Sequence, residues 1–194
     1  AFPEMDKYDL ALRLLSLQSS STAAVMQTVK GIVKRLEAQP DVPDEIDEWR
    51  LIQAAAEKVI QDSKAKALLD ALKSGFSVMK KSGAGKKAVI FTESAETQKM
   101  LTALLSDRYK TFVYNGGADY NEIRKFKAEG DILISTDSGA KGFNLENAAF
   151  VINYDLPFNT LKMEQRIDRC HRLGQENDVL SLAFIDKKNF ADVR

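Results

Sequence analysis

The sequence predicts an α/β fold: a parallel sheet with helices on both faces, preceded by an all-helical segment. Two observations predict it. Residues 5–81 carry apolar residues at three- and four-residue spacing and show no strand pattern, which indicates helices. After residue 87, short apolar runs alternate with helical patterns, as expected when the strands of a parallel sheet are buried on both sides.

The helical segment divides at its polar stretches. We expect one helix at residues 10–17 and another after the serine cluster at 19–21, whose hydroxyls suit an N-cap. A loop with two prolines leads into a third helix at about Asp44, and an Asp-Ser pair caps a fourth that runs to about residue 81. We place the domain boundary so that residues 1–62 form a helical linker or protrusion and residues 63–194 form the α/β domain.

The α/β domain is predicted from its apolar runs. We expect strands at 88–91, 111–114, 131–135, 149–154 and 179–185, and helices at 94–106, 121–129 and 160–173. Polar loops (TES, NGG, STDSGAKGFN and DLPFN) directly follow the first four strands. Ligands of parallel sheets collect at the carboxyl ends of strands, so these loops are candidate sites.

Composition limits the class of protein. The chain has 194 residues with 28 basic and 28 acidic side chains, so any contact with nucleic acid must come from a local arrangement of donors. A single cysteine fits a reducing cytosol, and no run approaches 18 apolar residues, so we expect a cytoplasmic protein without a membrane partner. The abrupt ends of the sequence suggest a piece of a longer protein.

Two motifs carry candidate chemistry. In STDSGAKGFN, hydroxyls and glycines would let a phosphate approach the backbone, although a simple turn of small polar residues is equally compatible. In QRIDRCHRLGQ, helical spacing would put Gln165, Asp168, Arg169 and Arg172 on one face, either to bind phosphate oxygens or as a solvated charged face. SGAGKK is not a P-loop, because it lacks the first glycine and the final hydroxyl and leads into a strand.

Three stretches together carry a family resemblance. STDSGAKGFNL, INYDLPFN and QRIDRCHRLGQ, in this order, resemble the C-terminal RecA-like lobe of superfamily 2 helicases. The last motif is most similar to that of Swi/Snf-type DNA-translocating ATPases, Gln-x-x-Asp-Arg-x-His-Arg-x-Gly-Gln. DLPFN followed by EQRI resembles the bacterial branch that includes the RNA-polymerase-recycling ATPase. The resemblance covers residues 62–185 and implies a RecA-like fold.

The resemblance also implies a nucleotide site. In such proteins ATP and Mg²⁺ lie between two RecA-like lobes and are bound mainly by the first, through GKT- and Asp-Glu-type motifs that this sequence lacks. The second lobe supplies arginine fingers, which correspond here to Arg169 and Arg172, and Gln165 helps to place them. The catalytic residues implied are therefore Arg169, Arg172 and Gln165. The nucleotide-binding residues implied are Gly142, Asn144 and Asp168.

Contacts with the nucleic-acid backbone are implied as well. They fall on residues that end or follow strands: Thr92, Gly117, Ser135 and Thr136. The STDSGAKGFN loop itself departs from the family pattern, since Ser138 stands where relatives have alanine and Ala140 stands where they have the middle glycine. Contacts of this kind would be largely independent of base sequence.

The resulting functional prediction is the second motor lobe of an ATP-dependent double-stranded DNA translocase or remodeller. Its expected partners are an N-terminal RecA-like lobe, the duplex DNA backbone, and RNA polymerase or another DNA-bound complex. The piece alone should not hydrolyse ATP, whereas its parent should be a nucleic-acid-dependent ATPase. Two alternatives stay open: a lobe of a strand-separating RNA or DNA helicase, and a non-catalytic binding module on the same fold.

Overall fold

A computed structural model describes residues 7–38, 43–59, 62–116, 120–137, 143–189 and 192. The structure divides the chain into two compact units. One comprises Lys64–Ile185, and the other combines Ala1–Ser63 with Asp186–Arg194. The chain therefore passes from the helical unit into the α/β unit and returns to the helical unit at its end.

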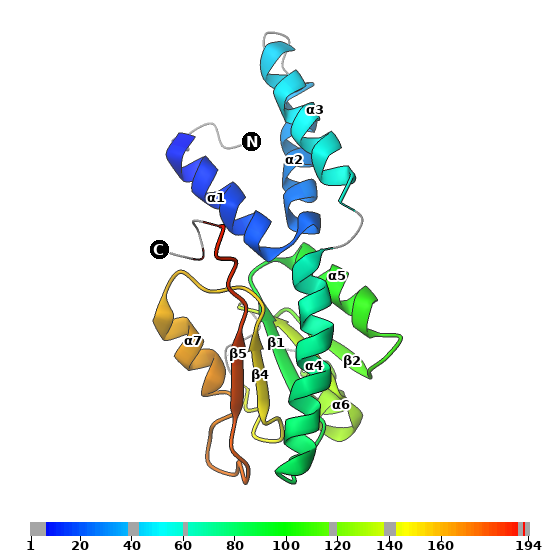
Figure 1. Cartoon of the computed structure of the whole chain (residues 1–194), viewed down its shortest axis with the longest axis vertical. Helices are drawn as coiled ribbons and strands as arrows, with labels where there is room; N and C mark the ends of the chain where they lie inside the picture. Colours follow the sequence, from blue (N-terminus) through cyan, green and yellow to red (C-terminus); the bar gives the residue numbers. More distant parts are fainter. Residues whose placement is uncertain are drawn as a thin grey trace. The chain divides into compact units, whose positions relative to one another are not determined.

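The helical unit contains α1 (Lys7–Ser20), α2 (Thr22–Leu36) and α3 (Pro43–Glu57) (Figure 1). The serine cluster acts as predicted, because the hydroxyl of Ser21 accepts a hydrogen bond from the Ala24 amide at 3.1 Å and caps α2. The segment after residue 185 joins this unit through Asn189, whose Nδ2 donates to the Leu15 carbonyl at 2.8 Å.

The α/β unit is built on a parallel sheet of five described strands in the order β2-β3-β1-β4-β5 (Figure 1). The strands are β1 (Ala88–Thr92), β2 (Thr111–Tyr114), β3 (Ile132–Thr136), β4 (Phe150–Asn153) and β5 (Leu180–Ala183). The helices are α4 (Ser63–Lys81), α5 (Ala95–Leu105), α6 (Asn121–Glu129) and α7 (Thr160–Ile167). The predicted fold class, a parallel sheet preceded by an all-helical segment, is confirmed.

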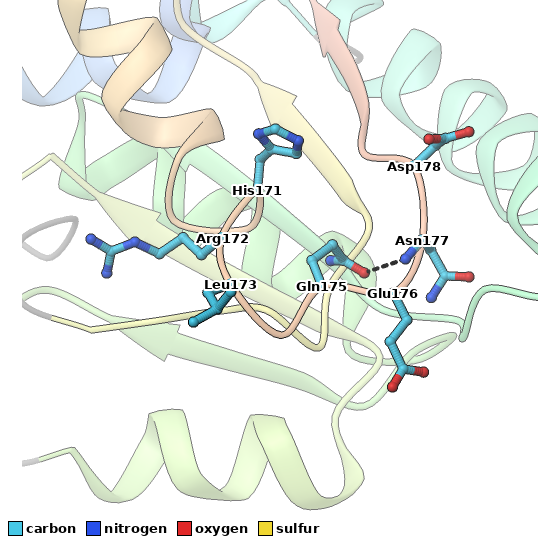
Figure 2. Close-up of a pocket in the computed structure, with 7 residues that line it drawn as sticks. All are labelled: His171, Arg172, Leu173, Gln175, Glu176, Asn177 and Asp178. Atoms are coloured by element: carbon cyan, nitrogen blue, oxygen red, sulfur yellow. Dashed lines mark hydrogen bonds between the residues drawn. The ribbon is translucent and has the colours of Figure 1, made fainter.

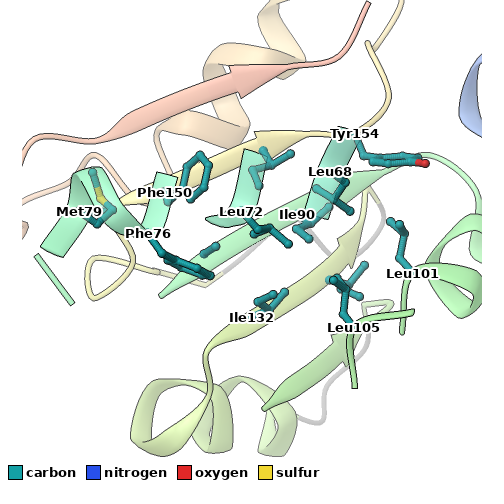
Figure 3. Packing of buried hydrophobic residues seen from close by; sticks show 14 of the residues in the cluster. Leu68, Leu72, Phe76, Met79, Ile90, Leu101, Leu105, Ile132, Phe150 and Tyr154 are labelled. Atoms are coloured by element: carbon teal, nitrogen blue, oxygen red, sulfur yellow. The ribbon is translucent and has the colours of Figure 1, made fainter. Parts of the chain in front are cut away.

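Alternating strand residues build one apolar core on each face of the sheet. Even-numbered residues of β1 and β3, such as Ile90 and Ile132, pack with Leu68 and Leu72 of α4 and with Leu101 of α5 (Figure 3). Their neighbours along the strands pack on the other face, where the core is formed by Val89, Phe91, Leu133 and Val151 with Ile123 and Phe126 of α6 and with Cys170. Helices thus cover both faces of the sheet, which explains the near-continuous apolar strands.

One predicted element is wrong in its extent. Helix α7 ends at Ile167, whereas the sequence indicated a helix to about residue 173. The carbonyl of Arg169 accepts a hydrogen bond from the Leu145 amide at 2.7 Å, and Gly174 adopts a left-handed φ of 101°. The Leu145 amide occupies the carbonyl that would accept from residue 173 in a continuing helix, and the Arg172 amide donates to the Cys170 carbonyl at 3.2 Å instead of to residue 168. The left-handed Gly174 then turns the chain toward β5. Arg172 therefore does not share a helical face with Gln165, and residues 168–175 form a turned stretch that we call the arginine segment.

Candidate functional site

The predicted site residues fall into two groups. Thr92 and Thr136 end β1 and β3, so they lie with Ser135 at the carboxyl edge of the sheet. Asn144 lies between β3 and β4 and is joined to the arginine segment, which follows α7. Gly117 and Gly142 lie outside the described residues, as do Ser138 and Ala140.

The hydroxyls at the carboxyl edge are directed into the lobe. Thr92 is buried, and its Oγ1 donates to Oδ2 of Asp155 at 2.6 Å. Ser135 is buried too, and its Oγ donates to the Thr136 carbonyl at 3.1 Å. The Thr92 side chain thus connects the end of β1 to the segment after β4, whereas the Ser135 side chain bonds within β3. Their predicted contact with a nucleic-acid backbone stays a prediction.

The arginine segment is fastened to the stretch before β4. The Arg169 carbonyl accepts from the Leu145 amide, and Nη1 of Arg172 donates to Oδ1 of Asn144. Farther along, Nε2 of Gln175 donates to the Ala148 carbonyl at 3.0 Å. Asn144 and Arg172, one predicted to bind nucleotide and the other to act on phosphate, are therefore in direct contact.

Both members of that contact face solvent. Asn144 and Arg172 are exposed, as are Gln165 in the last turn of α7 and its C-cap residue Asp168. Arg169 is half-buried, and its Nε is buried without a hydrogen-bond partner among the described residues.

A pocket of about 440 Å³ opens along the same segment (Figure 2). It is lined by His171, Arg172, Leu173, Gln175, Glu176, Asn177 and Asp178. Oε1 of Gln175 accepts from the Asn177 amide at 3.0 Å and so fixes one wall. Leu173 is fully exposed, at 103% of its reference area, so the segment presents an apolar as well as a cationic side chain to solvent.

Cys170 lies between Arg169 and Arg172 in the sequence, and its side chain is buried. Its side chain has no exposed area and packs in the core formed with Leu145, Ala148 and Val151. Burial, with a smaller contribution from the charge of Glu146, raises the pKa of the thiol to about 12. Cys170 is thus an apolar anchor of the arginine segment.

The sequence did not single out Arg166, the residue of α7 that is buried. Its side chain is 1% exposed. Nε donates to Oδ1 of Asp137 at 2.9 Å, and Nη2 donates to the same oxygen. Nη1 donates to Oδ1 of Asn153 at 3.1 Å and to the Asp155 carbonyl at 2.9 Å. The guanidinium also lies 5.5 Å from the centre of the Phe91 ring.

Charges around Arg166 alternate in sign. Lys162 lies 3.1 Å from Asp137 and 3.8 Å from Glu93, and Lys64 lies 3.5 Å from Asp155. Burial alone would raise the pKa of Asp137, but the charge and hydrogen bonds of Arg166, with those of Lys162, hold it below its ordinary value. Burial and the neighbouring charge of Asp137 raise the pKa of Glu93. A signal was present in the sequence: Glu93, Asp137 and Asp155 each follow a strand, and acids at one sheet edge require a cation.

In the described ranges there is no group of three or more His, Cys, Asp or Glu side chains able to hold a metal ion. None of the helices described is both long and apolar enough to cross a bilayer.

Comparison with known proteins identifies relatives among helicases. Residues 63–174 match the family described as helicase conserved C-terminal domain. The chain is 35% identical over 167 residues to a protein of Bacillus subtilis (strain 168) named uncharacterized ATP-dependent helicase YqhH, covering 82% of this chain and 28% of that protein. It is 30% identical over 105 residues to the ATP-dependent RNA helicase RhlB of Xanthomonas axonopodis pv. citri (strain 306), covering 51% and 18%. The chain thus spans less than a third of the length of these relatives.

Solved structures agree on the fold. The C-terminal part of the Fun30 ATPase domain superposes with a TM-score of 0.60 at 24% identity, covering 98% of this chain and 75% of that one. The Pyrococcus furiosus Hef helicase domain superposes with a TM-score of 0.61 at 15% identity, covering 91% and 38%. S. cerevisiae Dbp5 bound to RNA and ADP BeF3 superposes at 0.50 with 25% identity, covering 64% and 34%.

The first two likenesses establish the architecture alone, because their identities are low. The family match, in contrast, extends over more than half of the chain and ends at Gly174, inside the arginine segment. Together with the five-stranded parallel sheet and its covering helices, it shows that this chain belongs to the family of helicase conserved C-terminal domains and has their RecA-like fold.

Proposed function

We propose that the chain is the second motor lobe of an ATP-dependent translocase that acts on double-stranded DNA. The observation that supports this best is the contact between Arg172 and Asn144, on an exposed segment whose sequence ends His-Arg-x-Gly-Gln. In this proposal Arg169 and Arg172 are the arginine fingers, and Gln165 helps to orient them. Asn144, Gly142 and Asp168 bind the nucleotide.

The fingers would act on the γ-phosphate of ATP held by an N-terminal lobe together with Mg²⁺. Two guanidiniums stabilise the negative charge that spreads over the transferring phosphoryl group, a contribution of about 10³–10⁵ in rate in well-studied cases. The exposed side chain of Arg172 suits this role, because an incoming acceptor can reach it. The Nε of Arg169 is buried and has a donor that no described residue uses. In the absence of ATP, Asn144 would hold Arg172 in place.

Our preference for duplex DNA over RNA as the substrate rests on the QRIDRCHRLGQ motif and not on the relatives. The relatives include proteins named RNA helicases, and Dbp5 was solved with RNA. The His171-Arg172-Leu173-Gly174-Gln175 ending resembles the Swi/Snf type. We therefore keep a strand-separating RNA or DNA helicase as the second candidate.

Further parts of the proposal concern the parent protein. Thr92, Gly117, Ser135 and Thr136 would contact the DNA backbone, and residues 1–62 would link the lobe to its partner or dock a DNA-bound complex such as RNA polymerase. The proposed location is the cytoplasm. Because the chain spans 28% of the YqhH relative, the ATPase activity is assigned to a longer protein that carries both lobes.

ATP hydrolysis by the longest native chain containing this sequence tests the proposal. Rates are measured without nucleic acid and with duplex DNA, single-stranded DNA or RNA, for the native protein, Arg172→Ala and Arg124→Ala. Arg124 is an exposed arginine on α6 and serves as the matched control. We expect stimulation by duplex DNA that Arg172→Ala abolishes and Arg124→Ala retains. Stimulation by RNA or single strands alone would favour a helicase, and no hydrolysis under any condition would make the lobe a binding module.

A further inference from the structure

Arg166 connects the two groups of site residues. Its guanidinium binds three groups at the ends of β3 and β4: Asp137 directly after β3, Asn153 at the end of β4, and the Asp155 carbonyl beyond it. Its backbone carbonyl accepts from the amides of Asp168 and Arg169, the latter at 3.3 Å. One residue thus holds the carboxyl edge of the sheet with its side chain and the start of the arginine segment with its main chain.

The loops that Arg166 binds carry the proposed DNA contacts. Asp137 directly follows Ser135 and Thr136 at the end of β3. Asp155 accepts a hydrogen bond from the Thr92 hydroxyl at 2.6 Å and from the Glu93 amide at 2.8 Å, so the end of β1 is included. A shift of any of these strand ends changes the position of an acceptor of Arg166.

We propose that Arg166 is a positioning residue that couples the strand-end loops to the arginine fingers, so that binding of duplex DNA at the loops sets the place of Arg169 and Arg172. This inference rests on the proposed motor function. The connection is direct: the main chain runs from Arg166 to Arg169 in three residues. The planar guanidinium binds its acceptors in fixed directions, so a movement at the sheet edge turns the end of α7 rather than merely weakening a contact.

Comparison with Lys162 shows why a positive charge alone would not position the end of α7. Lys162 and Arg166 both lie near Asp137 and Glu93, with Nη2 of Arg166 at 3.9 Å from Oε1 of Glu93, but the Lys162 side chain is half-exposed. An ammonium group on a flexible stem balances charge without fixing direction. Replacing Arg166 by lysine therefore removes the directional contacts and keeps the charge.

Arg166→Lys and Asp137→Asn in the longest native chain test the inference, with Arg124→Lys as the matched control. The first readout is the ratio of ATP hydrolysis with duplex DNA to hydrolysis without it. We expect both variants to lower this ratio, by about 10²-fold for a displacement near 1 Å. Affinity for duplex DNA without ATP should stay within about twofold, because the backbone contacts themselves are retained. A merely structural role would lower both rates equally and leave the ratio unchanged, which would overturn the inference.

Alkylation of Cys170 supplies a readout that needs no activity. The thiol is buried between the two arginines, so its rate of modification, followed by mass spectrometry of the peptide that contains it, reports opening of the arginine segment. We expect faster alkylation in Arg166→Lys and Asp137→Asn and the native rate in Arg124→Lys. If the native protein hydrolyses no ATP, the motor proposal fails, and unchanged alkylation would separately refute positioning by Arg166. If one of the two variants does not fold, the other decides.

Discussion

Gly75 lies where α4 packs against Phe150 of β4, and alanine at this position should destabilise the lobe. A Cβ on Gly75 would lie 2.2 Å from Cε1 and 2.5 Å from Cζ of Phe150 in β4. Carbon atoms normally approach to about 3.5–4.0 Å. The Phe150 ring has no exposed area and meets the Phe76 ring edge-on, with centroids 6.1 Å apart (Figure 3). The ring therefore has little room to retreat.

The expected change in the free energy of unfolding on Gly75→Ala is the sum of two opposing contributions. Alanine is favoured over glycine inside a helix by about 1 kcal/mol. Overpacking a core costs about 1–3 kcal/mol, and contacts this short with a fully buried ring correspond to the upper part of that range. We therefore expect Gly75→Ala to lower the free energy of unfolding by about 1–2 kcal/mol. Gly31→Ala in α2 is the matched control, because no atom lies within 4 Å of its Cβ; it should stabilise by up to about 1 kcal/mol.

Urea unfolding distinguishes the expected destabilisation by Gly75→Ala from the expected stabilisation by Gly31→Ala. Far-UV circular dichroism follows the helices of both units, and fluorescence of Trp49, the single tryptophan, follows the unit that contains Gly31. Phe150→Leu should reduce the cost of Gly75→Ala, with a coupling of about 0.5 kcal/mol or more. A Gly75→Ala protein as stable as the Gly31→Ala protein, with no coupling to Phe150, would refute the packing described for α4.

Three further outcomes are expected. At pH 8 the native Cys170 thiol should react with iodoacetamide about 10³-fold more slowly than in urea, because its pKa is raised from 9.0 to about 12; equal rates would contradict its burial. Asp137→Asn should lower the free energy of unfolding by about 1–2 kcal/mol at neutral pH. Because the pKa of Asp137 is lowered in the folded state, its carboxylate adds stability above the ordinary pKa of 3.8, and this stability is lost as the pH falls through the folded-state pKa. The difference between Asp137→Asn and the native protein in urea unfolding should therefore shrink in acid. Lys87→Met should lower the free energy of unfolding in urea by about 1–3 kcal/mol, because Nζ of Lys87 donates at 2.8 Å to two carbonyls at the end of α6. Lys125→Met, on the exposed side of that helix, should lower it by less.

The sheet was predictable because its signal is local. Each strand of a doubly covered parallel sheet is a short apolar run, and the runs at 88–91 and 111–114 match β1 and β2 within one residue. Helix starts were also local: Ser21 and Ser94 cap α2 and α5 with their own hydroxyls. Such features depend on neighbours within four residues, which the sequence displays directly.

The end of α7 and the role of Arg166 were not predictable in this way. The helical periodicity of QRIDRCHRLGQ continues past Ile167, but the Arg169 carbonyl is taken by the Leu145 amide, which is 24 positions away in the sequence. In the sequence, Arg166 does not differ from the other two arginines of this motif. Its role depends on its hydrogen bonds to Asp137 and Asn153 in the folded protein. Both outcomes depend on contacts between distant segments, and periodicity carries no information about those.

The early end of α7 changes how the arginine segment can respond to its surroundings. On a continuous helix, Arg169 and Arg172 would be fixed to Gln165 by the helical repeat, and both would move as one rigid face. In the turned segment, the Leu145 amide holds the Arg169 carbonyl and Asn144 holds the Arg172 side chain. Both partners belong to the connection between β3 and β4 rather than to α7. A displacement of that connection would therefore move the arginines even if α7 stayed still, and a displacement at the sheet edge would act on the same arginines through Arg166. The β3–β4 connection thus reaches the arginines by two routes, directly through Asn144 and Leu145 and through Asp137 and Arg166.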